Sequence, residues 1–198
     1  MNTVQIIFKE RTLIIRESNK NEQAEIEKIH KAAFEKTEGA EKAQGISYLV
    51  RDLFDDETAM PIHSLVAIEN EKLIGHILFT KVTITDCPLD IEAQILAPLA
   101  VLPDFQSTGV GGRLIDEGLR QLKKAGIDLV FVLGHIDYYP RSGFINDAKS
   151  RGFEAPFYIP EEFAGAWMVM ELASGFIGKA KGIVKCSDVL NQPQHWRE

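Results

Sequence analysis

The sequence predicts an α/β fold of layered helices and strands. Segments with a strand-like pattern alternate with segments whose apolar residues recur at helical spacing, which is typical of this class. The chain has 198 residues, of which 45% are hydrophobic and 26% are charged, so it can fill a globular core. No internal repeat or low-complexity linker divides it. We therefore expect one domain over residues 1–198, with its core at 13–172 and an irregular tail at 173–198.

The first half of the chain is predicted to contain two helices and a β-hairpin. Asn21 is a favoured N-cap residue in front of the first helical pattern. Two apolar stretches flank the polar turn Glu69-Asn70-Glu71-Lys72, an arrangement that predicts an antiparallel hairpin. The expected elements are a strand at 13–16, helices at 22–34 and 46–54, and hairpin strands at 64–69 and 73–84.

The second half begins with a strand that contains Pro98. A proline removes one backbone donor, so within a sheet it is found at an edge or a bulge. An amphipathic helix follows, which Gly126 is placed to end. The run Leu129–Leu133 is apolar throughout and indicates a strand buried on both faces. The expected elements are strands at 91–101, 129–133 and 166–172 and a helix at 111–124.

Composition excludes several classes of function. The formal net charge is 22 − 29 = −7, which argues against a nucleic-acid partner and favours a cationic one. The two cysteines, Cys87 and Cys186, lie outside any C-x-x-C pattern, so we expect no disulfide framework and no metal site. No apolar stretch approaches the ~18 residues of a membrane span, and the apolar run at 6–8 is too short for a secretion signal. A cytoplasmic protein is expected.

A glycine-rich turn between the strand at 91–101 and the following helix is the most informative segment. Its sequence is Gln106-Ser107-Thr108-Gly109-Val110-Gly111-Gly112. The N–H groups that begin a helix lack partners there and the helix dipole is positive, so the turn favours a phosphate. A P-loop and a Rossmann fingerprint both require a glycine five residues after Gly109, and this chain has Leu114 there. The phosphate ligand is therefore expected to be neither of these nucleotide types.

The pattern Gln106-x-x-Gly109-x-Gly111 resembles the pyrophosphate loop of GNAT-type N-acetyltransferases. It is preceded by Leu99-Ala100-Val101-x-Pro103. Downstream, Tyr138-Tyr139-Pro140-Arg141-Ser142-Gly143-Phe144 is similar to the family's Tyr-x-Arg-Phe-Gly-Phe segment, from which it departs at Ser142. The resemblance implies a mixed, mostly antiparallel central sheet flanked by helices, in which two central strands splay apart.

The same resemblance implies that acetyl-CoA is the co-substrate. Its pantetheine arm would enter between the splayed strands, where backbone groups of Leu99, Ala100 and Val101 would bind it and polarise the thioester carbonyl. The pyrophosphate would be held by the loop and the start of the helix, that is by Gln106, Ser107, Thr108, Gly109, Val110, Gly111, Gly112 and Arg113.

The two proton transfers of the reaction suggest the catalytic residues. By resemblance, Tyr139 protonates the leaving thiolate, with Tyr138 as the adjacent alternative. An alkyl amine is mostly protonated at neutral pH, so a base must free its lone pair. Glu92 is our candidate base, on the same strand face as Gln94. His76 and His135 are the other candidates.

The segment from 35 to 57 is expected to select the acceptor, because the first two helices do so in the family. Its seven acidic residues exceed its three basic residues by four, which favours a cationic acceptor. We therefore expect transfer of an acetyl group to a primary amine of a small molecule or peptide by direct attack in a ternary complex. The alternatives are a non-catalytic acyl-CoA-binding module and a nucleotide-binding α/β protein. The apolar strand Trp167-Met168-Val169-Met170 suggests a homodimer contact, or plain core.

Overall fold

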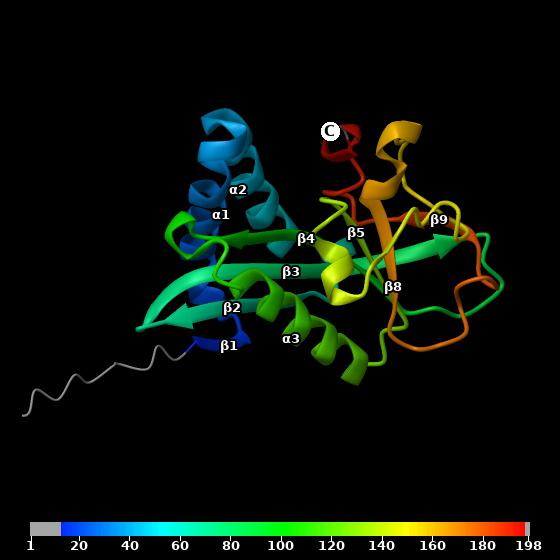
Figure 1. Cartoon of the computed structure of the whole chain (residues 1–198), viewed down its shortest axis with the longest axis horizontal. Coiled ribbons are helices and arrows are strands. Elements are labelled where there is room, and N and C mark those ends of the chain that lie inside the picture. Colours follow the sequence, from blue (N-terminus) through cyan, green and yellow to red (C-terminus); the bar gives the residue numbers. More distant parts are fainter. Residues whose placement is uncertain (1–12, 197–198) are drawn as a thin grey trace, which may run out of the picture.

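A computed structural model describes residues 13–196, so the apolar run at 6–8 lies outside the described residues. One nine-stranded sheet has the order β1-β2-β3-β4-β5-β8-β6, and β9 joins it to β7 (Figure 1). The strands are β1 (Leu13–Glu17), β2 (His63–Glu69), β3 (Lys72–Thr85), β4 (Ala93–Val101), β5 (Leu129–Leu133), β6 (Ile145–Asn146), β7 (Phe153–Glu154), β8 (Trp167–Glu171) and β9 (Gly182–Lys185). The long helices are α1 (Gln23–Glu38), α2 (Ala40–Asp55) and α3 (Val110–Lys124). This is the mixed, mostly antiparallel sheet with flanking helices that the sequence predicts.

The hairpin is confirmed, with β2 and β3 antiparallel and Asn70 and Glu71 both at positive φ in the turn. The predicted N-cap of the first helix, Asn21, is wrong. Asn19, not Asn21, begins the turn in front of α1, and its backbone N–H donates to the Glu22 carboxylate at 2.7 Å. The second helix begins earlier than predicted, at Ala40, because only Gly39 at a φ of +84° separates it from α1.

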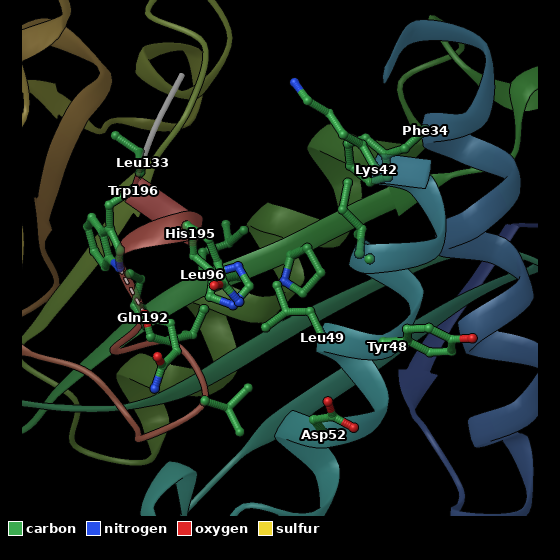
Figure 2. Close-up of a pocket in the computed structure, with 18 of the residues that line it drawn as sticks. Phe34, Lys42, Tyr48, Leu49, Asp52, Leu96, Leu133, Gln192, His195 and Trp196 are labelled. Atoms are coloured by element: carbon green, nitrogen blue, oxygen red, sulfur yellow. Dashed lines mark hydrogen bonds between the residues drawn. The ribbon is translucent and has the colours of Figure 1, made fainter. Parts of the chain in front are cut away.

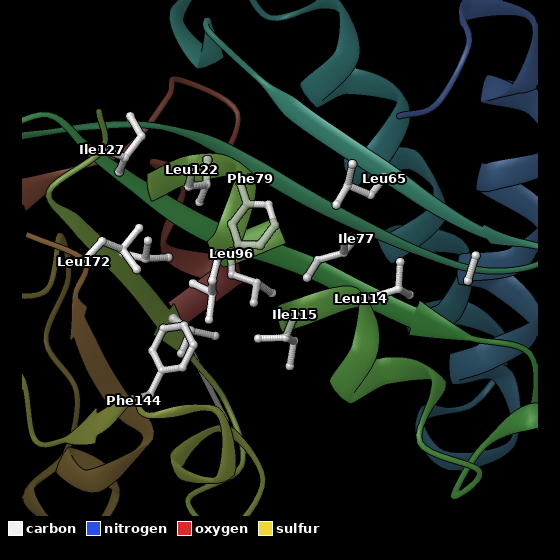
Figure 3. Close-up of a cluster of buried hydrophobic side chains, with 14 of the residues drawn as sticks. Leu65, Ile77, Phe79, Leu96, Leu114, Ile115, Leu122, Ile127, Phe144 and Leu172 are labelled. Atoms are coloured by element: carbon white, nitrogen blue, oxygen red, sulfur yellow. The ribbon is translucent and has the colours of Figure 1, made fainter. Parts of the chain in front are cut away.

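The helices cover opposite faces of the sheet. Neighbouring residues of β2 point to opposite sides, so Leu65 packs with Leu114 and the rest of α3, as Figure 3 shows. Val66 packs with Ile26 and Ile29 of α1 on the other side. Helices α1 and α2 therefore lie on one face and α3 on the other (Figure 1).

The strand predicted at 166–172 is β8, and it lies inside the sheet. It pairs with β5 along one edge and with β6 along the other. Trp167, Met168 and Val169 are all buried. Core, rather than a subunit contact, is therefore the correct interpretation of this apolar strand.

The tail was predicted to be irregular, and this is wrong for part of it. Strand β9 pairs with the far end of β3 and with β7. Val184, Leu190 and Trp196 are buried in the same cluster as Phe153 and Trp167. Sequence patterns miss this because polar residues and glycines separate the apolar ones. Within residues 13–196, no helix combines the length and apolar character needed to cross a bilayer.

Candidate active site

Strands β4 and β5 part in the middle of the sheet. They pair in parallel only from Ala93 to Ile95, opposite Leu129 to Phe131. On the other side of β4, the register with β3 shifts between Ile77 and Phe79, which face Leu99 and Leu96. The shift leaves one extra residue in β4, at Ala97-Pro98, as expected for a proline at a bulge. The splayed central strands predicted from the family resemblance are present.

A cavity of about 980 Å³ opens at this splay. Residues 95–98 of β4 and Leu133 of β5 form its floor. Helices α1 and α2 form one wall, and the segment 188–196 forms the other (Figure 2). Backbone groups released from strand pairing therefore lie next to a space large enough for a small organic molecule.

The glycine-rich turn joins β4 to α3. Gly109 is the N-cap of α3, and its φ of +88° is a conformation that favours glycine. Thr108 donates its hydroxyl to the Phe105 carbonyl at 2.6 Å. The Gln106 amide donates to the Val101 carbonyl at 3.0 Å and to the Ala33 carbonyl at 3.4 Å. The Gln106 side chain therefore anchors the turn to β4 and α1. The first N–H groups of a helix have no partner within it, so those of α3 can donate to a ligand.

The remaining predicted loop residues lie along the start of α3. Ser107 has a φ of +60°, Val110 and Gly111 are buried, and Gly112 has open space beside its α-carbon. Arg113 is exposed and, together with Asp116, lines a shallow depression against β1. The loop residues are thus contiguous, with the Arg113 side chain directed toward another surface. Their binding of a cofactor stays a prediction.

The two tyrosines lie in the loop after β5, where Tyr138 is the N-cap and Tyr139 the first residue of a short 3-10 turn, Tyr139–Ser142. Their rings meet edge to face with centroids 5.2 Å apart, and Tyr139 packs in the same way against Phe144 at 5.8 Å. Both pack against the core cluster beneath α3. Burial raises the pKa of Tyr139 and, to a lesser degree, that of Tyr138, so both phenols keep their protons at neutral pH.

The structure places none of the predicted bases in the cavity, and neither Tyr138 nor Tyr139 lines it. Glu92 is exposed just before β4, and its backbone N–H donates to Asp128 at 3.0 Å. Gln94 is buried and donates to the Pro61 carbonyl at 2.9 Å. His76 lies in the core, and His135 is exposed in the loop after β5. None of these four residues lines the cavity.

Sequence reasoning missed the segment 187–196 as part of the site. Its end nearest β9 is held to the turn after α2, because the Val189 N–H donates to Asp56 at 3.1 Å and the Asp188 N–H to Thr58 at 2.8 Å. Its other end is held by Trp196, which donates to the Leu190 carbonyl at 2.8 Å. The only sequence signal was Val189-Leu190 and Trp196 standing out in a polar stretch.

Known proteins resemble this chain in sequence and in structure. The acetyltransferase (GNAT) domain family matches residues 14–145. The uncharacterized N-acetyltransferase YjhQ of Escherichia coli strain K12 is 41% identical over 174 residues, which are 86% of this chain and 90% of that protein. The Escherichia coli GNAT family N-acetyltransferase YhbS, solved in complex with CoA, superposes with a TM-score of 0.80 at 25% identity and covers 95% of this chain and 97% of its own. A GNAT acetyltransferase from Brucella melitensis, in complex with acetyl-CoA, gives a TM-score of 0.69 at 28% identity and covers 90% and 98%.

Proposed function

The chain belongs to the GNAT acetyltransferase family, and on that premise we propose that it transfers the acetyl group of acetyl-CoA to a primary amine of a small molecule or peptide. The amine attacks the thioester directly while both substrates are bound. Two solved relatives, in complex with CoA and with acetyl-CoA, support the choice of donor.

The observation that carries the proposal is the position of the cavity at the parting of β4 and β5. Pairing stops after Ile95, and the cavity floor begins at that residue and continues to Pro98. A pantetheine arm lying along the unpaired part of β4 would present its thioester to this cavity. The glycine-rich turn at Gly109 lies beyond the end of the same strand, where it would hold the pyrophosphate.

The lining of the cavity supports an amine that carries an apolar body. Leu49 of α2, Leu96 of β4 and Trp196 give it an apolar interior (Figure 2). Among the described residues, three acidic side chains, Glu38, Asp52 and Asp188, line it together with one basic side chain, that of Lys42. Glu38 and Asp52 belong to the acidic surplus noted in the sequence. A surplus of negative charge attracts an ammonium group.

We place the reaction in the cytoplasm. Cys87 and Cys186 are both free thiols, and unpaired cysteines are typical of a reducing compartment.

A direct test combines binding with turnover. Acetyl-CoA binding is measured by calorimetry, and release of free CoA thiol is measured with a panel of aliphatic, aromatic and peptide amines, with mass spectrometry of the products. We expect binding of acetyl-CoA and acetylation of at least one amine with an apolar body. Binding without transfer to any amine would instead support the non-catalytic acyl-CoA-binding alternative.

A salt series tests the charge of the acceptor. Screening shortens the reach of surface charges to about 8 Å at physiological ionic strength. We expect the KM of a cationic acceptor to rise with salt, and to rise in Asp52→Asn, while the KM of acetyl-CoA stays constant. If neither added salt nor Asp52→Asn raises the KM of the acceptor, the argument for a cationic acceptor fails.

A further inference from the structure

His195 occupies a place in the cavity that none of the predicted bases holds. It lies on the short 3-10 helix Pro193–Trp196 and lines the cavity together with Leu96 and Pro98 of β4. Figure 2 shows its imidazole directed into the cavity, across from Leu49 of α2. The residues of β4 beside it are those that have just lost their pairing with β5.

The position of His195 is set by its buried neighbour. Trp196 is 4% exposed and meets Trp167 of β8 edge to face, with ring centroids 5.5 Å apart. Its indole N–H is bonded to the Leu190 carbonyl. The helix cannot rotate without breaking this packing, so the backbone of His195, next to Trp196, is held beside the cavity.

The electrostatic surroundings suit a proton acceptor. The charged side chains that line the cavity with His195 are Glu38, Lys42 and Asp52 from the helix wall and Asp188 from its own segment. Glu38 is paired with Lys42 at 3.4 Å and Asp52 with Arg51 at 2.8 Å, and these side chains are more than a third exposed. Partial burial lowers the pKa of His195 below its usual 6.5. Its imidazole is therefore neutral at pH 7 and has a lone pair to offer.

We propose that His195 is the general base that takes a proton from the acceptor amine in the cavity. This inference rests on the proposed N-acetyltransferase function. It replaces Glu92, which is exposed and lies outside the cavity lining.

The acceptor enters as R–NH3⁺ and transfers one proton to the His195 imidazole, which later releases it to solvent. The amine lone pair then attacks the thioester carbon, so that a C–N bond forms and the C–S bond breaks. The new amide nitrogen then loses its second proton to solvent, Tyr139 protonates the departing thiolate, and the Tyr139 phenolate regains a proton from solvent, so that one proton is released in all. The products are R–NH–acetyl and CoA with its thiol protonated.

The test uses the full chain with an amine that the wild-type protein acetylates. His195→Gln keeps a polar side chain of similar size but cannot take up a proton. Asn191→Ala is the matched control, because Asn191 is exposed in the same segment and does not line the cavity. Acetyl-CoA affinity and thermal unfolding are measured for each protein, so that a folding defect is recognised separately.

We expect the kcat of His195→Gln to fall by about 10²-fold at pH 7, the usual size of a general-base contribution, while Asn191→Ala stays within twofold of wild type. In the wild type, kcat should level off above pH 6.5. In His195→Gln, log kcat should keep rising with pH toward the pKa of a free amine, about 10.4. Imidazole added to His195→Ala should restore part of the lost turnover, which a merely structural role would not allow.

Two negative results are distinguishable. Absence of transfer by the wild-type protein overturns the proposed function. An active wild type whose kcat and pH profile are unchanged in His195→Gln overturns the role of His195 and leaves the function standing.

Discussion

The phenol of Tyr138 lies directly beside the α-carbon of Gly111, so that a β-carbon at this position would fall well inside contact distance of the tyrosine hydroxyl. Gly111 belongs to the start of α3 and Tyr138 to the loop after β5. The glycine-rich turn and the tyrosine pair, which are far apart in the sequence, therefore meet at one point. Gly112, the next residue, has nothing within 4 Å of its own β-carbon position.

This contact predicts opposite effects for two neighbouring substitutions. Gly112→Ala should raise the free energy of unfolding by about 0.5 kcal/mol, because alanine favours helix without meeting a neighbour. Gly111→Ala should lower it by about 1 kcal/mol relative to Gly112→Ala, because the Tyr138 ring must move. Urea unfolding of both variants measures the difference. Equal stability of the two would mean that Tyr138 moves without cost.

The buried histidines predict a loss of stability in mild acid. His30 of α1 and His76 of β3 share a hydrogen bond of 2.7 Å in the core. Burial lowers the pKa of His30 to about 3, and burial followed by the charge of His30 lowers that of His76 well below 6.5. The unfolded chain binds protons below about pH 6.5 that the folded chain does not. The contribution of each histidine is therefore complete above that pH and falls by about 1.4 kcal/mol per pH unit below it.

Urea unfolding between pH 7.5 and pH 5 measures this slope. His30→Gln should reduce the slope by about one proton, because one of the two buried imidazoles is gone. His135→Gln, at an exposed position in the loop after β5, is the matched control and should leave the slope as it is in the wild type. If the pH dependence of the free energy of unfolding is the same in His30→Gln as in the wild type, groups other than His30 cause the acid sensitivity.

Tyr139→Phe tests the proposed general acid. Burial raises the pKa of Tyr139, so the phenol is a proton donor at every pH near neutrality. We expect kcat to fall by about 10²-fold while acetyl-CoA affinity stays within twofold, because the ring and its packing on Phe144 remain. Steady-state kinetics and calorimetry provide the two readouts. Tyr138→Phe is the comparison, and a larger effect there would transfer the role to Tyr138.

Trp196 is predicted to control acceptor binding through the segment 187–196. Trp196→Ala removes the ring that packs on Trp167, so the wall formed by that segment should loosen. We expect the KM of the acceptor to rise more than tenfold and acetyl-CoA affinity to stay constant, as judged by kinetics and calorimetry. Trp196→Phe keeps an aromatic ring and should give an intermediate effect. A fall in acetyl-CoA affinity in Trp196→Ala would show that the two halves of the site are not separate.

The agreement between prediction and structure depends on how local each feature is. The strand Leu129–Leu133 and the end of α3 before Gly126 were predicted correctly, because an apolar run and a glycine after an amphipathic helix are signals carried by neighbouring residues. The start of α2 was missed, because its first turns have no apolar side chain larger than alanine and include Gly45, so no apolar stripe marks them. Strand β9 was missed because its pairing partners lie on β3 and β7, far away in the chain.

The residues of the candidate site also differ in how local their sequence signals are. The glycine-rich turn and the tyrosine motif could be read from the sequence, since each depends on residues a few positions apart whose spacing serves one local conformation. The base could not. Glu92 and His195 are both ionisable residues in polar surroundings, and only the packing of Trp196 against Trp167 places one of them in the cavity. The sequence by itself determined the family and the glycine-rich turn; the tertiary structure decided which distant segments enclose the cavity, because burial and cavity shape arise only when those segments pack together.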